Sequence, residues 1–489
     1  MQTTDYMIGL LASSLIRDGG TLQIGIGSLG DAIVYGTILR HKENGFYRQV
    51  LGETGVLESC SEVIHRVGGT DVFEQGLYGC SEMFVSGFKE LYENEILTRK
   101  VYPDATIQRL LNQGKISSRV TPAMLEVLFE EGVISRPLTP SDGDFLKKLG
   151  IFRQDVVVND RGIMLPDGTT LSADFAENGV SSKLADCLGK ELCGGVVLHG
   201  GFFLGPRSFY DWLNGMDEAE RSKFAMTSVR YVNQMFGNQE LTSQQRIHGR
   251  FINTTMIMKL YGAACSDGLE NGQVVSGVGG QYNFVSMAHE LPDGRSILML
   301  RSTRTKGKDV RSNIVDHYGH TTISRHLRDI VVSEYGIAVI RGKTDQQVAT
   351  ALINIADSRF QDELLTQAKK AGKIAAHYVI PDRFRANLPE RIEDGLKSHK
   401  KKGYFPVFPF GTDFTKEELV LAKILKSMKK KLARPSGMMK AMVQSAGKSR
   451  IPDGALSYLE RMELTNPTSF KERMIQKILV AELVSGGYA

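Results

Sequence analysis

A short apolar segment, 21–26, runs directly into the glycine motif Gly25-x-Gly27-x-x-Gly30 and then into a stretch of helical periodicity from Asp31. A strand, a glycine turn and a helix in this order form the repeating unit of α/β folds, whose ligands bind at the carboxyl ends of strands. Further strand-like runs alternate with helical patterns along most of the chain. The sequence therefore predicts an α/β fold with a mostly parallel sheet and helices on both faces.

The periodicity changes in two places, and these changes divide the chain. Between 98 and 189, short helical patterns are separated by Pro and Gly, and Asp167-Gly168 predicts the turn of a hairpin. We interpret 98–189 as a subdomain inserted into an α/β catalytic domain that is made of 1–97 and 190–380. From 381 to 489 the chain is Lys-rich, which predicts a helical C-terminal extension with a solvated basic face.

Composition limits the class of protein. The chain has 489 residues, of which 42% are apolar and 24% charged, as expected for a globular protein with a buried core. Its net charge of +5 is small for a nucleic-acid-binding protein. The cysteines show no zinc-binding spacing, and no stretch is apolar over the roughly 20 residues that span a membrane. We expect a cytoplasmic protein that binds no nucleic acid, no membrane and no metal ion.

The first glycine motif leaves several interpretations open. It fits the dinucleotide-binding pattern, so a dehydrogenase is one alternative, although Glu53 does not close a second strand as the ribose-binding residue should. A tight turn without a ligand is another, and backbone N–H groups that face an anionic or acyl group are a third. His317, His320 and His326 complete no known metal motif, and hydrogen bonding is their more common role.

A second glycine-flanked segment, Gly76–Gly87, contains the sequence CSEM with Glu82 at its third position. Apolar residues from Phe84 onward recur at helical spacing, so we expect a helix to begin near Glu82. A carboxylate is ionised at neutral pH without a base, and it attacks a thioester carbonyl where its surroundings exclude water. The structural alternative is a glutamate that stabilises the positive end of a helix dipole.

The sequence Gly277-Val278-Gly279-Gly280-Gln281 has a property that complements this carboxylate. Attack on a thioester develops an oxyanion, and the N–H groups of glycines reach an oxyanion with no Cβ in the way. A β-bulge or a tight turn is the alternative. We expect 274–278 to form a strand that leads into this loop.

Together these segments resemble the acetyl-CoA hydrolase/transferase family, a branch of the glutamate-dependent CoA-transferases. The stretches that carry the resemblance are 15–33, 77–88, 224–234, 249–291 and 318–345. The resemblance implies that Glu82 is the nucleophile and that Gly279 and Gly280 form the oxyanion loop. It implies that CoA and substrate are bound by Gly25, Ile26, Gly27, Gly277, Val278 and Gln281.

The resemblance also implies a reaction. Glu82 takes the acyl group of an acyl-CoA, CoA attacks the resulting anhydride, and a carboxylic acid resolves the glutamyl-CoA thioester. Resolution by water would make the chain a hydrolase, and a CoA-binding module without turnover is a further alternative. Family members usually carry two similar α/β domains with CoA between them. We therefore expect a catalytic C-terminal half that is completed by an N-terminal domain or by another chain, or that forms a homo-oligomer.

Overall fold

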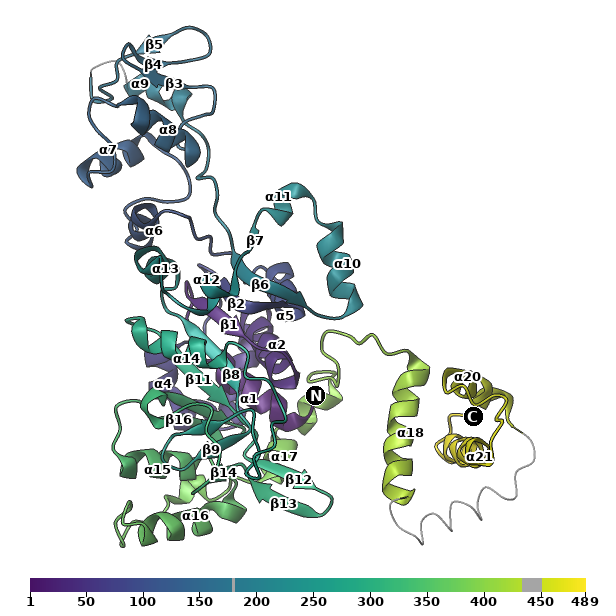
Figure 1. Cartoon of the computed structure of the whole chain (residues 1–489). Helices are drawn as coiled ribbons and strands as arrows, with labels where there is room; N and C mark the ends of the chain where they lie inside the picture. Colours follow the sequence, from purple (N-terminus) through teal and green to yellow (C-terminus); the bar gives the residue numbers. More distant parts are fainter. Residues whose placement is uncertain (178–180, 433–450) are drawn as a thin grey trace. The chain divides into compact units, whose positions relative to one another are not determined.

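The computed structural model describes residues 1–177, 181–432 and 451–489, except for the side chains of 181–182 and 430–432 (Figure 1). It comprises two compact units: 1–205 with 209–410, and 206–208 with 411–489. All the residues that the sequence predicts for the site belong to the larger unit. None of the helices in the described ranges is long and apolar enough to cross a membrane.

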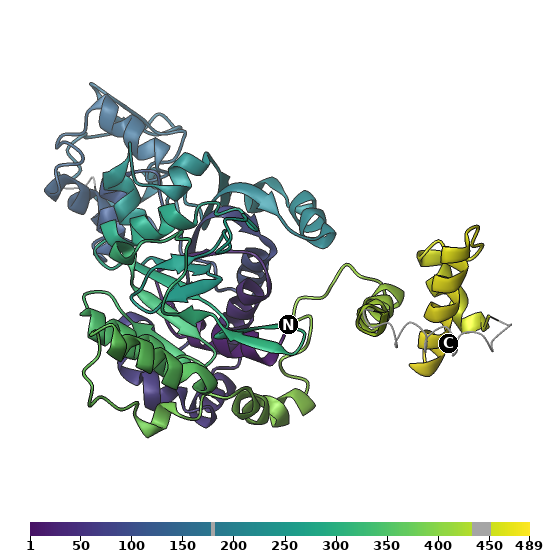
Figure 2. The same cartoon turned by 60° about the horizontal axis from the view of Figure 1, so that its bottom comes forward.

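An eight-stranded sheet forms the centre of the larger unit (Figure 1 and Figure 2). Its order is β16-β15-β11-β8-β1-β2-β6-β7, and all neighbours are parallel except β15 and β16. The strands are Thr21–Ile24 (β1), Tyr78–Val85 (β2), Leu198–Leu204 (β6), Phe224–Met226 (β7), Arg250–Thr254 (β8), Arg295–Met299 (β11), Ile330–Ser333 (β15) and Gly336–Val339 (β16). The predicted mostly parallel α/β fold is confirmed.

Helices cover both faces of this sheet. Successive residues of a strand point to opposite faces, so one strand contributes side chains to two cores. Ile297 and Met299 of β11 pack into one core, and Leu298 between them packs into another. The first core includes α1 (Thr3–Ser13), α2 (Ser28–Lys42), α3 (Asn44–Glu53), α4 (Val56–Val67), α5 (Ser86–Glu93) and α17 (Pro389–Lys401). The second includes α14 (Gln281–Glu290), α15 (Asp345–Asn354) and α16 (Ser358–Lys370).

Residues 102–192 have a hydrophobic core of their own. Its elements are α6 (Ala105–Asn112), α7 (Pro122–Glu130), α8 (Pro140–Lys148), β3 (Val157–Asn159), β4 (Gly162–Met164), β5 (Thr170–Leu171), α9 (Ser181–Leu184) and η1 (Ala185–Cys187). Asp167-Gly168 lies in the turn between the antiparallel strands β4 and β5, as predicted. A backbone bridge between Val101 and Val196 joins the two ends of this region. The separate core supports the predicted insertion, although its boundaries stay a prediction.

Smaller elements complete the larger unit, except that the first two residues of α10 belong to the smaller unit. They are α10 (Arg207–Gly215), α11 (Glu218–Arg221), α12 (Val229–Asn233), α13 (Gln239–Gln245), β9 (Ile257–Lys259), β10 (Ala264–Cys265), β12 (Thr303–Lys306), β13 (Asp309–Ser312), β14 (Ile314–Val315), η2 (Arg325–Leu327) and η3 (Asp382–Phe384). Strands β10, β9 and β14 form a small sheet, and β12 pairs with β13.

The smaller unit is helical. It starts at 411, whereas the predicted helical extension starts at 381, and α17 from that range packs into the first core of the larger unit. It contains α18 (Lys416–Leu432), η4 (Asp453–Ala455), α20 (Leu456–Arg461) and α21 (Phe470–Ser485). Leu421, Leu459 and Leu479, one from each α-helix, share a single core. The part of the predicted extension at 433–450 lies outside the described residues.

Two local predictions beside the candidate site are wrong. Glu82 does not begin a helix: it lies within β2, and α5 begins only at Ser86. β2 pairs with β1 on one side and with β6 on the other, and these hydrogen bonds outweigh the helical spacing of the apolar residues. Residues 274–278 form no strand of the sheet; they belong to the loop before α14, and only Val274 makes an isolated bridge.

Candidate active site

Glu82 stands in the second half of β2, in the middle of the sheet. Its neighbours Ser81 and Met83 pair with β6, and an added Cβ on Gly201 of β6 would lie 2.9 Å from the carbonyl oxygen of Glu82. The Glu82 side chain is half-buried. Because ligands of parallel sheets bind at the carboxyl ends of strands, this position suits a reactive side chain.

The carboxylate of Glu82 lies against Gly279 and Gly280. A Cβ on Gly280 would lie 2.2 Å from Oε2, and one on Gly279 would lie 3.6 Å from Oε1. Only glycine at 280 therefore allows the carboxylate to stay where it is. Gly279 also has a φ of +50°, in the left-handed region that glycine adopts without strain. The structure thus brings together three predicted site residues that are far apart in the sequence.

Asn233 is a residue of this site that the sequence analysis did not identify. It ends α12, and its Nδ2 donates a hydrogen bond to Oε2 of Glu82 at 2.5 Å. A hydrogen bond to an ionised oxygen is among the stronger ones, so it holds the carboxylate in place. The Oδ1 atom of Asn233 is buried without a partner among the described residues, and an acceptor in that state favours a ligand that donates. Its only signal in the sequence was its place within the stretch 224–234.

The remaining residues of the second loop differ in their surroundings. Gln281 is buried at the start of α14, and its Nε2 donates to the carbonyl oxygen of Thr254 at 3.1 Å, at the end of β8. Gly277 and Val278 are exposed. The structure therefore ties Gln281 to the sheet edge and leaves the first part of the loop open to solvent.

The first glycine loop borders other hollows at the carboxyl ends of the strands. Gly25, Ile26 and Gly27 line a cavity of about 310 Å³ together with residues that follow β2 and end β6. Ile26 and Gly27 also line a hollow of about 800 Å³ that includes Arg301. Glu82 lines neither of these two hollows. The structure does not place the first loop in contact with the carboxylate.

The buried side chains next to Glu82 are not alternative nucleophiles. Burial raises the pKa of the Cys80 thiol, so the thiolate is disfavoured. The hydroxyl of Tyr78 hydrogen-bonds to Nδ1 of His199 at 2.7 Å. Burial, with a smaller effect of the Arg246 charge, lowers the pKa of His199 to about 4, so this imidazole is neutral at neutral pH. Glu82 is the side chain of this group that meets the glycine loop.

Residues 205–368 match the acetyl-CoA hydrolase/transferase C-terminal domain family. This segment, about a third of the chain, is similar to that domain family. The matched range includes Asn233 and the glycine loop at 277–281, and it begins after Glu82.

Curated proteins similar to part of this chain are named as CoA-transferases. A 4-hydroxybutyrate coenzyme A transferase from Clostridium kluyveri is 35% identical over 173 residues, which are 35% of this chain and 37% of that protein. A butyryl-CoA:acetate CoA-transferase from Anaerostipes caccae is 34% identical over 176 residues, which are 35% of this chain and 36% of that protein. The chain thus spans little more than a third of the length of these relatives. A solved 4-hydroxybutyrate CoA-transferase from Porphyromonas gingivalis has a TM-score of 0.39 at 19% identity, over 76% of this chain and 56% of that one.

Proposed function

We propose that this chain transfers CoA between an acyl-CoA and a carboxylic acid, with Glu82 as the nucleophile. The observation that carries the proposal is the Glu82 carboxylate, which lies against Gly279 and Gly280 and accepts a hydrogen bond from Asn233. The CoA-transferases among the relatives support the class of reaction. CoA is then a substrate, and the chemistry rests on side chains and backbone of this chain.

The proposed reaction begins with attack of a Glu82 carboxylate oxygen on the thioester carbonyl carbon. A C–O bond forms, the C–S bond breaks, and CoA leaves as its thiolate, which gives an acyl-glutamyl anhydride. The thiolate then attacks the Glu82 carbonyl carbon, releases the first carboxylate and forms a glutamyl-CoA thioester. An acceptor carboxylate repeats both steps in reverse and frees Glu82.

The proposed roles of the neighbours follow from where they lie. Asn233 holds Oε2 of Glu82, which leaves Oε1 to attack. The N–H groups of Gly279 and Gly280 stabilise the oxyanion that develops on the thioester oxygen, and one such donor is worth about 10²–10³ in rate. We further propose that CoA and substrate lie along Gly25, Ile26, Gly27, Gly277, Val278 and Gln281.

Hydrolysis is the second candidate function, and one observation favours it. Glu82 is half-buried and the loop at 277–279 is exposed, so water has access to an acyl-enzyme at this site. A second α/β domain, or a second copy of the chain, would cover the site and favour a carboxylate acceptor over water.

Covalent trapping tests the proposal. The full chain is incubated with acetyl-CoA and then with borohydride, which reduces a glutamyl thioester to an alcohol that peptide mass spectrometry locates. We expect the reduced residue at position 82. Glu82→Gln should lower turnover by more than about 10³-fold and abolish the label. Glu93→Gln, which removes a carboxylate from the neighbouring helix α5, is the matched control and should keep the label.

The outcomes separate the candidates. Isotope from labelled acetate that appears in acetyl-CoA, without net release of free CoA, indicates a transferase. Net release of free CoA that does not depend on acetate indicates a hydrolase. A label that persists in Glu82→Gln rejects this nucleophile. CoA binding by calorimetry without any acyl-enzyme rejects turnover by this chain and supports a binding module.

A further inference from the structure

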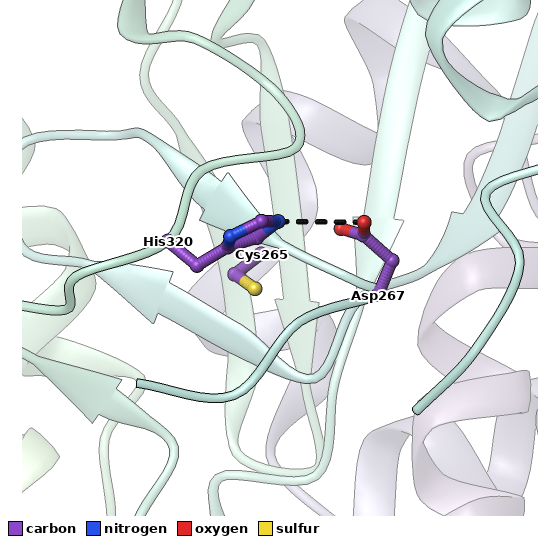
Figure 3. Close-up of side chains that lie close together, drawn as sticks. All are labelled: Cys265, Asp267 and His320. Atoms are coloured by element: carbon purple, nitrogen blue, oxygen red, sulfur yellow. Dashed lines mark hydrogen bonds and ion pairs between the residues drawn. The ribbon is translucent and has the colours of Figure 1, made fainter. Parts of the chain in front are cut away.

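A second cluster of reactive side chains lies next to the segment that leads into the glycine loop at 277–281. Figure 3 shows its three residues. Cys265 ends β10, Asp267 follows it, and His320 comes from the segment between β14 and β15. Their sulfur, oxygen and nitrogen atoms all lie within 4.8 Å of one another. Nε2 of His320 lies 3.4 Å from Oδ2 of Asp267, the pair joined by the dashed line in Figure 3. The proposed acyl transfer uses none of these residues.

Neighbouring hydroxyl groups hold the first two residues in place. Cys265 is fully buried, and its carbonyl oxygen accepts a hydrogen bond from the hydroxyl of Thr255 at 2.9 Å. Oδ1 of Asp267 accepts one from the hydroxyl of Thr322. The same Thr322 oxygen accepts the N–H of Ser266 at 2.8 Å. The Asp267 carboxylate is therefore oriented by a residue that itself binds the backbone beside it, as is usual around metal ligands.

Gly268 positions both the imidazole and the thiol. A Cβ at this position would lie 2.6 Å from Cδ2 and 2.8 Å from Nε2 of His320, so only glycine lets the ring lie this close. The thiol of Cys265 donates to the carbonyl oxygen of Gly268 at 3.0 Å. Gly268 therefore lies against both the Cys265 sulfur and the His320 ring, which are two potential metal ligands.

We propose that Cys265, Asp267 and His320 bind a divalent transition-metal ion, with Zn²⁺ as the ion that fits this donor set best. Zn²⁺ binds thiolate, imidazole and carboxylate at about 2.0–2.3 Å, and tetrahedral ligands then lie roughly 3.5 Å apart. The His320–Asp267 separation of 3.4 Å already has this value. A sulfur ligand disfavours Mg²⁺ and Ca²⁺. Binding displaces the thiol proton to solvent, and water occupies the fourth position.

Such an ion would fasten the base of the loop that reaches Glu82. The carbonyl oxygen of Asp267 accepts the N–H groups of Val275 at 2.8 Å and Ser276 at 3.3 Å, just before Gly277. A metal that fixes Asp267 therefore fixes the backbone that leads to the proposed oxyanion loop. Any effect on acyl transfer rests on the proposed function, whereas metal binding itself does not.

Cobalt spectroscopy tests the site. Co²⁺ is titrated into the full chain after treatment with a chelator, and a near-ultraviolet charge-transfer band reports a thiolate–Co²⁺ bond. We expect one Co²⁺ per chain, with a band that Zn²⁺ removes. Cys265→Ser should lose the band, and His320→Gln should weaken binding by about 10–100-fold. Cys193→Ser, which alters an exposed thiol, and His317→Gln are matched controls and should bind as the unmodified chain does.

Several results would overturn the inference: no Co²⁺ or Zn²⁺ bound at equimolar concentration, a band that Cys265→Ser retains, or a band that Cys193→Ser loses. If Cys265→Ser does not fold by circular dichroism, the half-buried Asp267→Asn is measured instead and should show the same weakening as His320→Gln. A chain that binds Co²⁺ at this site but forms no acyl-enzyme keeps the metal site and rejects the proposed function.

Discussion

The two glycine-rich loops have similar sequences, but their glycines are required for different reasons. In the first loop, a Cβ on Gly30 would lie 2.3 Å from the carbonyl oxygen of Gly25, so glycine allows helix α2 to start against its own loop. In the second, a Cβ on Gly280 would lie 2.2 Å from the carboxylate of Glu82. One glycine makes room for backbone and the other for a reactive side chain. The spacing of glycines alone does not distinguish these two uses.

One carboxylate lies beside each loop, Asp31 at the first and Glu82 at the second, and their surroundings differ. Asp31 lies in the first turn of α2 and lines the 310 Å³ cavity, and burial raises its pKa. Glu82 instead accepts a hydrogen bond from Asn233. Burial makes the Asp31 carboxylate costly to ionise, whereas Asn233 holds the Glu82 carboxylate beside Gly280.

Among variants of the two loops and of the residues beside them, the largest effect should come from Gly280→Ala, apart from the loss of Glu82 itself. The added Cβ takes the space of the Glu82 carboxylate, so we expect labelling of Glu82 by acetyl-CoA to slow by about 10²–10³-fold. Gly52→Ala is the matched control, because a Cβ there meets nothing within 4 Å and lies in helix α3. Single-turnover labelling followed by mass spectrometry gives both rates. Equal rates in the two variants would mean that the contact between Gly280 and Glu82 does not matter for the chemistry.

Gly30→Ala should act on stability instead. Its Cβ meets a backbone oxygen that moves only with the loop, so we expect the free energy of unfolding to fall by about 2 kcal/mol. Urea denaturation measures this change. Because Gly25 belongs to the proposed substrate-binding loop, KM should rise more than kcat falls. A loss of kcat as large as that of Gly280→Ala would remove the distinction between the loops.

Asp31→Asn should have the smallest effect, with a sign set by pH. The pKa of Asp31 is raised in the fold, so its ionisation destabilises the native state, and that penalty appears as pH rises above the unfolded value of about 3.8. We expect the variant to be about 0.5–1 kcal/mol more stable at pH 7. The gain should disappear at pH values below both pKa values. Urea denaturation at both pH values, with the exposed Asp160→Asn as control, checks this; a gain that does not vary with pH would contradict it.

The sequence predicted the sheet and the pairing of Glu82 with the second loop better than it predicted local geometry. Alternation of strands and helices is a property of the chain itself, and the family resemblance linked Glu82 to Gly279 and Gly280. The strand around Glu82 was not predicted because the apolar residues of β2 and α5 together follow the spacing of one helix. Only the pairing with β1 and β6 shows that 78–85 is a strand.

Contacts between single side chains from distant segments could not be predicted. Asn233 reaches Glu82 across 151 residues of sequence, and His320 reaches Asp267 across 53. Motif spacing describes neighbours on one helix or one loop, so it contains no information on such pairs. The histidines at 317, 320 and 326 suggested no metal site because the other donors, Cys265 and Asp267, lie on another segment.

The Val101–Val196 bridge has a consequence for how this chain tolerates change. Since the ends of region 102–192 meet there, the region forms a side branch, and the strands before and after it, β2 and β6, are neighbours in the sheet. Closing a loop twice as long costs only about 0.6 kcal/mol, so the length of such a branch is nearly free to vary. Nδ2 of Asn112 donates a hydrogen bond to the carbonyl oxygen of Gln244 at 2.8 Å. A different segment inserted in place of 102–192 would have to replace this contact. The branch is therefore the natural point at which to graft a reporter or an affinity module.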